Sequence, residues 1–75
     1  MTPTPAQIRA ARSLLGITAA ELAKASGVNQ RTVLAIETGN HSNPTVKTFE
    51  AIKTALESRG IEWIGETGVD LRGST

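Results

Sequence analysis

Apolar residues in the first 60 positions recur every three or four residues, the spacing of an α-helix with one buried face. Four such segments, separated by glycines and polar residues, predict helices over about residues 5–15, 18–26, 29–38 and 45–59. The apolar face of the first helix consists of Ile8, Ala11, Leu14 and Leu15. The apolar face of the fourth consists of Val46, Phe49, Ile52, Ala55 and Leu56. The predicted fold class is therefore mainly α.

The predicted helix ends carry residues that start and stop helices. Thr4-Pro5-Ala6-Gln7 and Thr18-Ala19-Ala20-Glu21 both have the spacing of a capping box, in which a hydroxyl and a side chain three residues later satisfy two N–H groups. Asn29 is a suitable N-cap for the third helix. A glycine follows each of the four segments, which is typical of a helix C-terminus.

The pattern changes after residue 60. Ile61, Trp63, Val69 and Leu71 alternate with polar residues around a turn bounded by glycines, which predicts a β-hairpin or short extended segment over about residues 61–72. A short fifth helix over residues 61–64 is the alternative, because four residues do not fix a period. We therefore divide the chain into a helical unit, residues 1–60, and a C-terminal extension, residues 61–75.

Composition narrows the classes of function. A chain of 75 residues forms one small domain with a limited core. It contains no cysteine and a single histidine, His41, so we expect no catalytic nucleophile–base pair, no metal site and no cofactor. The chain is accordingly expected not to be an enzyme. No apolar run approaches the length of a membrane span and no signal segment is present, so we expect a cytoplasmic protein without a membrane partner.

The charge is nearly balanced, at +1, but it is unevenly distributed. Residues 1–42 carry four basic and two acidic side chains, whereas residues 43–75 carry four basic and five acidic ones. A mildly basic first half suits a module that presents one end to phosphate groups, although an asymmetry of this size also arises by chance.

The second and third predicted helices have the composition of a helix-turn-helix. Ala23 is small enough for two helices to approach closely, and Gly27 allows the chain to reverse between them. Val28, Val33 and Ile36 anchor one face of the third helix. The opposite face is left free for contacts outside the domain.

Residues 7–56 resemble the Cro/Xre-type (lambda repressor-like) helix-turn-helix family. The resemblance is carried by Arg12-x3-Gly16-Ile17-Thr18-x2-Glu21-Leu22-Ala23-x3-Gly27-Val28-x7-Ile36-Glu37-x-Gly39, followed by Pro44-Thr45 and an apolar helix. It implies a lambda repressor-like domain of four to five helices over residues 1–60. It also implies a bacterial or phage DNA-binding protein whose third helix lies in the major groove.

The resemblance further implies a role for individual residues. Contacts to base edges are expected from Gln30, Arg31, Leu34 and Ala35. Contacts to the DNA backbone are expected from Thr18, Ala19, Asn29, Thr32, Thr38, Asn40, His41 and Ser42. Arg12 and Glu37 are expected to form a structural pair between the first helix and the end of the third. Without the resemblance, Gln30 and Arg31 would be read as ordinary solvated side chains.

Such domains usually bind DNA as symmetric dimers. We expect Trp63, Ile64, Val69 and Leu71 to form the homodimer surface of the extension, including through strand pairing between copies. The alternative is that the hairpin only covers the core of one copy. The favoured function is a sequence-specific regulator of transcription, a repressor that occupies an operator in double-stranded DNA as a dimer. The alternatives are the antitoxin of a toxin–antitoxin pair, which would also bind a toxin protein, and a helical protein-interaction module without DNA binding.

Overall fold

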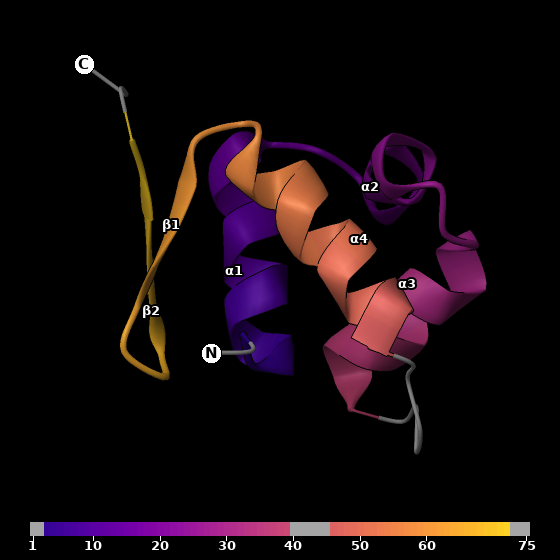
Figure 1. Cartoon of the computed structure of the whole chain (residues 1–75), viewed down its shortest axis with the longest axis horizontal. Coiled ribbons are helices and arrows are strands. Elements are labelled where there is room, and N and C mark those ends of the chain that lie inside the picture. The colour runs from indigo at the N-terminus through magenta and orange to yellow at the C-terminus, as the bar shows by residue number, and fades with distance from the viewer. Residues whose placement is uncertain (1–2, 40–45, 73–75) are drawn as a thin grey trace.

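The computed structural model describes residues 3–39 and 46–72. In chain order these residues form α1 (Pro5–Leu15), α2 (Ala19–Ser26), α3 (Gln30–Thr38), α4 (Val46–Glu57), β1 (Ile61–Ile64) and β2 (Gly68–Leu71). The predicted mainly helical fold with a C-terminal hairpin is confirmed, and residues 61–64 form a strand rather than a fifth helix. The hairpin lies on one side of α1, while α2 and α3 lie on the other (Figure 1).

The helix ends follow the capping signals in the sequence. In both capping boxes the threonine hydroxyl accepts from the N–H of the third helical residue, and that residue's side chain accepts from the threonine N–H. The fourth helix ends at Glu57, two residues before the predicted end at residue 59. The chain tightens there, since the N–H groups of Arg59 and Gly60 bond the carbonyls three residues earlier. The predicted start at residue 45 lies outside the described residues.

One apolar core joins all four helices and the hairpin. Its members include Ile8 from α1, Leu22 from α2, Val33 from α3 and Ile52 from α4, all fully buried. Ile61 of β1 is also buried in this cluster. The C-terminal extension is therefore packed into the same core as the helical unit.

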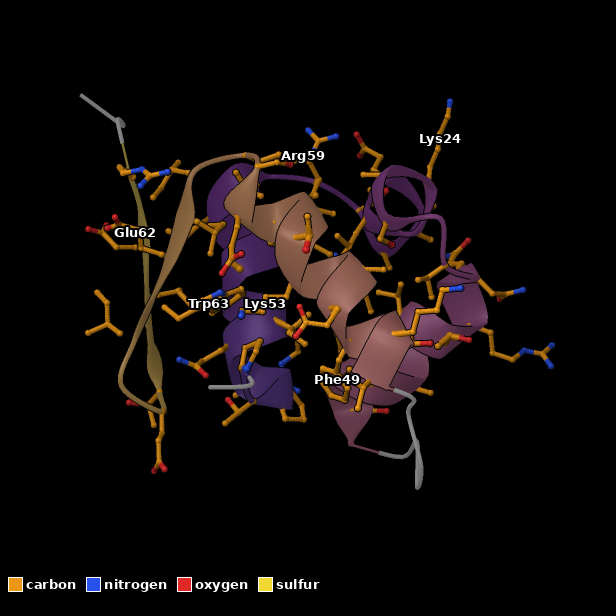
Figure 2. The ribbon with its side chains drawn as sticks, in the orientation of Figure 1. Lys24, Phe49, Lys53, Arg59, Glu62 and Trp63 are labelled. Carbon is orange, nitrogen blue, oxygen red and sulfur yellow. The ribbon has the colours of Figure 1, made fainter. Side chains whose placement is uncertain are left out.

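The hairpin has an inner and an outer face. Its strands pair antiparallel, with Ile61 opposite Leu71 and Trp63 opposite Val69, so these four side chains share the face that packs on the helices. Trp63 is directed from β1 towards the helices and Glu62 away from them (Figure 2). The Trp63 indole N–H donates to the Glu57 carboxylate at 2.9 Å.

The four residues expected to form a dimer surface do not lie on one face. Trp63, Val69 and Leu71 are half-buried against the core of their own chain. Ile64 is on the outer face and is 56% exposed. Their distribution fits the alternative in which the hairpin covers the core, and it leaves Ile64 as the exposed apolar residue of the four.

Gln7 fastens the hairpin to α1. Its side chain is 1% exposed, and its amide nitrogen donates to the carbonyls of Gly65 at 3.1 Å and Gly68 at 2.9 Å. The amide oxygen accepts from the N–H of Thr4 at 2.9 Å, which completes the capping box. One buried amide therefore both starts α1 and holds the hairpin turn, about 60 residues later in the chain.

Candidate nucleic-acid interface

The turn between α2 and α3 sets the position of the third helix. Gly27 ends α2 in the left-handed conformation, with φ of 72°. Val28 donates its N–H to Ala23 at 3.0 Å, and the Asn29 side chain then caps α3 by accepting from the N–H of Arg31 at 2.8 Å. Because Val33 and Ile36 are buried, one face of α3 is fixed against the core. The other face is directed outwards.

The side chains expected to meet base edges lie on this outer face. Gln30 and Arg31, in the first turn of α3, are exposed, and Leu34 one turn later is 43% exposed. Ala35 is half-buried, so its methyl group is less accessible than the other three side chains. The main-chain N–H of Arg31 is used in the cap, but neither the Gln30 nor the Arg31 side chain forms a hydrogen bond or ion pair with a residue that the structure describes. Their side-chain polar groups are therefore available for a ligand.

Residues expected to meet the DNA backbone lie at the helix ends. The hydroxyl of Thr18 caps α2 by accepting from the N–H of Glu21, and the hydroxyl of Thr38 donates within α3 to the Leu34 and Ala35 carbonyls. The Ala19 side chain is buried, so a contact from this residue would come from its main-chain N–H. Thr32 is half-buried in the first turn of α3. Asn40, His41 and Ser42 lie outside the described residues.

Arg12 and Glu37 join α1 to the last turn of α3. The Arg12 guanidinium donates through Nε and Nη2 to the two oxygens of the Glu37 carboxylate, at 2.8 and 2.9 Å. Its Nη1 donates to the Ile17 carbonyl at 3.2 Å, directly before the N-cap of α2. The hydrogen bond that Arg12 donates to Glu37 raises the pKa of Arg12, against the smaller opposing effect of burial. This arrangement fixes both ends of the helix-turn-helix relative to α1.

Sequence reasoning missed a second arginine at this junction. Arg9, one turn before Arg12 on α1, donates from Nη1 to the main-chain carbonyl of Glu37 at 3.1 Å. In the sequence it was only an exposed position beside the apolar face of the first helix. An (i, i+3) pair of arginines on one helix is a signal that both reach the same neighbour, but the sequence does not name that neighbour.

Within residues 3–39 and 46–72, no three histidine, cysteine, aspartate or glutamate side chains are grouped as metal ligands would be. No helix in these two ranges has both the length and the apolar character needed to cross a membrane.

Comparison with known proteins identifies the family. No curated protein matches the chain. The family model HTH_3, described as Helix-turn-helix, matches residues 8–64, which include most of α1, all of α2, α3 and α4, and strand β1. This family comprises DNA-binding domains that are typically not enzymes. Since the match covers well over half of the chain and its helix-turn-helix geometry agrees with it, the chain belongs to the HTH_3 family of Cro/C1-type, Xre-like helix-turn-helix domains.

Proposed function

We propose that the chain is a sequence-specific double-stranded DNA-binding regulator of transcription that acts as a repressor by occupying an operator. The observation that carries this proposal is the outer face of α3, where Gln30 and Arg31 are exposed at the start of a helix whose inner face is locked in the core. Glutamine can bond adenine and arginine can bond guanine through two hydrogen bonds each, so the first turn of α3 has the chemistry for reading bases.

The small net charge is compatible with this role. Much of the backbone binding in such complexes comes from main-chain N–H groups and uncharged side chains at helix N-termini. The starts of α2 and α3 supply such groups at Thr18 and Asn29. Base reading is then limited to a few side chains, so we expect a short recognition sequence supplemented by contacts of Leu34 with thymine methyl groups and by DNA shape.

Selection of bound duplexes from a random pool tests the proposal. A regulator of this kind should return one preferred sequence, and two inverted copies of it would report a dimer together with the spacing of its half-sites. A pool that returns no preference would contradict sequence-specific regulation. If salt-dependent binding to mixed-sequence DNA were absent as well, the protein-interaction module would be the better account.

We also propose that the regulator binds as a homodimer through the outer face of its hairpin. Ile64 supports this proposal, because it is 56% exposed on this face and a second copy would remove its apolar surface from water. The hairpin has only two strands, β1 and β2, so each strand retains one edge without a strand partner among the described residues. A second copy is the partner that the symmetry of an inverted-repeat operator requires.

A further inference from the structure

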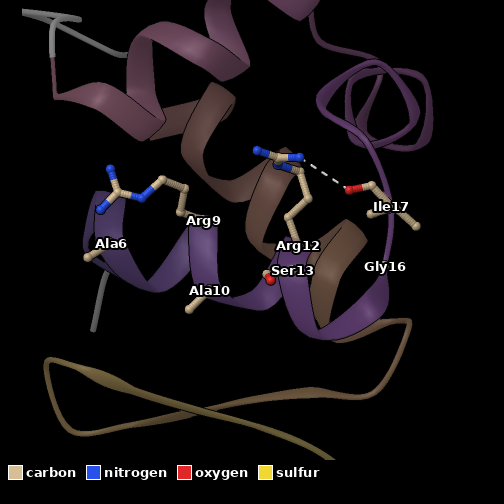
Figure 3. Close-up of a pocket in the computed structure, with 7 residues that line it drawn as sticks. All are labelled: Ala6, Arg9, Ala10, Arg12, Ser13, Gly16 and Ile17. Carbon is tan, nitrogen blue, oxygen red and sulfur yellow. Dashed lines mark hydrogen bonds between the residues drawn. The ribbon is translucent and has the colours of Figure 1, made fainter.

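The surface of α1 is hollowed along its length, as far as the connection to α2. Ala6, Arg9, Ala10, Arg12, Ser13, Gly16 and Ile17 line this hollow, and Figure 3 shows both arginines leaving the same side of α1. Its floor consists of small side chains, mainly alanine and serine. A bulky group can therefore approach the helix closely without displacing a side chain.

The two arginines of the hollow differ in what they already bind. All three guanidinium nitrogens of Arg12 are engaged, two by the Glu37 carboxylate and one by the Ile17 carbonyl. Since Arg12 occupies both oxygens of Glu37, the charge of that carboxylate is already paired. Among the residues that the structure describes, Arg9 bonds only the neutral main-chain carbonyl of Glu37, through one of its five N–H groups.

The charge of Arg9 is therefore uncompensated within the part of the chain that the structure describes. No ion pair involving Arg9 is formed there, and its side chain lies on an exposed position of α1. An exposed guanidinium with free N–H groups beside an open surface of small residues is suited to a phosphate, which accepts two parallel hydrogen bonds.

We propose that Arg9 binds a phosphate of the DNA backbone in this hollow. The proposal rests on the proposed function and extends the interface from the helix-turn-helix onto α1. The hydrogen bonds of Arg12 and Arg9 place the hollow between Ile17, next to the start of α2, and Glu37, in the last turn of α3. A DNA strand that contacts both the start of α2 and the end of α3 would pass the Arg9 guanidinium. Arg9 would then supply a positive charge between the uncharged contacts expected at these two helix ends.

The salt dependence of binding to a mixed-sequence duplex tests the proposal without knowledge of the operator. Arg9→Gln removes the charge but keeps a donor for the Glu37 carbonyl. The slope of log affinity against log salt concentration is negative for such a protein. In Arg9→Gln this slope should become less steep by about 0.9, the value for one lost phosphate contact. The substitution should weaken binding to mixed-sequence and selected duplexes by the same factor and leave the selected sequence unchanged. Lys24→Gln is the matched control, because Lys24 extends from α2 away from the other helices (Figure 2).

A second variant keeps the test independent of how Arg9→Gln folds. Ser13 is exposed in the hollow, and Ser13→Glu places a negative charge next to the expected phosphate. Its affinity for mixed-sequence DNA should fall well below that of Thr54→Glu, which adds the same charge to an exposed position on α4.

Three results would overturn the proposal, and they can be told apart from failure of the proposed function. An Arg9→Gln slope equal to that of the wild type would show that Arg9 binds no phosphate. A changed base preference with an unchanged slope would assign Arg9 to the positioning of α3. Equal losses in Ser13→Glu and Thr54→Glu would show that the hollow is not at the interface. If the wild-type protein itself shows no salt-dependent binding, the proposed function fails together with this inference.

Discussion

Arg12 holds both oxygens of the Glu37 carboxylate, at 2.8 and 2.9 Å, across the contact between α1 and the last turn of α3. The two partners are not equally placed, because the Glu37 side chain is 3% exposed whereas that of Arg12 is 25% exposed. Glu37 therefore depends on Arg12 for its charge to be tolerated, while Arg12 retains access to water. The pair secures the end of the helix that we assign to DNA recognition.

This inequality predicts which partner matters more for stability. Arg12→Met should lower the free energy of unfolding by about 3 kcal/mol, because it leaves a buried carboxylate unpaired. Glu37→Gln should cost less, since the remaining amide can still accept from Arg12 and the arginine can reach solvent. Urea unfolding of both variants measures the difference. Equal losses, or a larger loss in Glu37→Gln, would contradict the unequal burial of the two partners.

The exposed face of α3 predicts a separation between binding and stability. Gln30→Ala and Arg31→Ala should each weaken binding to the selected sequence by about 1–3 kcal/mol, because each removes a pair of hydrogen bonds to one base. Neither side chain supports the core, so the urea midpoint should stay at the wild-type value. Lys24→Ala removes an exposed side chain from α2 and should leave both quantities unchanged. Loss of stability in either α3 variant would assign that residue a structural role.

Gln7 predicts that the hairpin can be loosened from α1 without removing any of its own residues. Gln7→Leu removes the two bonds to the Gly65 and Gly68 carbonyls and should cost about 1–3 kcal/mol. Hydrogen exchange of the β1 and β2 amides should accelerate more than exchange in α2. Gln30→Ala, which removes a glutamine far from the hairpin, is the control. Uniform acceleration throughout the chain would show that the hairpin does not loosen separately.

The proposed dimer predicts that a lysine has different effects on the two faces of the hairpin. Ile64→Lys, on the outer face, should abolish the dimer in sedimentation and leave the fold intact. Val69→Lys, on the inner face, should unfold the protein because it places a charge against the core. Removing the whole extension is a poorer test, since it takes Ile61 out of the core. A wild-type protein that sediments as a monomer at every concentration would contradict the dimer.

The cap of α2 predicts a stability change in acid. The N–H of Thr18 donates to the Glu21 carboxylate, and this bond, with a smaller contribution from the Thr18 side chain, lowers the pKa of Glu21. The folded pKa thus lies below the unfolded one, so the stabilisation is complete above the unfolded value and is lost as the pH falls through the folded value. In Glu21→Gln the urea midpoint should fall less steeply below about pH 5 than in the wild type. Parallel curves would show that the cap contributes nothing to acid sensitivity.

The sequence was sufficient to predict the four helices and the residues of the turn between α2 and α3, because these depend on local spacing and capping. For residues 61–64 it favoured a strand of a hairpin but left a short helix open. It did not predict how wide each buried face is. Leu14 and Val46 belong to the apolar stripes of α1 and α4, yet they are 47% and 78% exposed. Periodicity shows which face of a helix is apolar. How much of that face is buried depends on the helices and strands that pack against it.

Contacts between distant segments explain the remaining differences. The sequence placed Gln7 in a capping box but gave no reason to connect it with the hairpin turn, because that contact exists only after the chain has folded back on α1. Similarly, the alternation in residues 61–72 predicted two faces without indicating which one meets the helices. The apolar residues assigned to an interface between copies were for the most part those that the chain needs for its own core.

The Gln7 contact also bears on the order in which the molecule assembles. Helices α2 and α3 can meet after the closure of a short loop, whereas the bonds of Gln7 join residues 58 and 61 positions apart. Contacts of such long range slow folding because the chain entropy is lost before they form. The helix-turn-helix is thus expected to form in the folding nucleus, with docking of the hairpin on α1 as a late step. Until that step, the Ile61 side chain and the inner face of the hairpin remain in contact with water. Docking of residues 61–72 therefore completes the core.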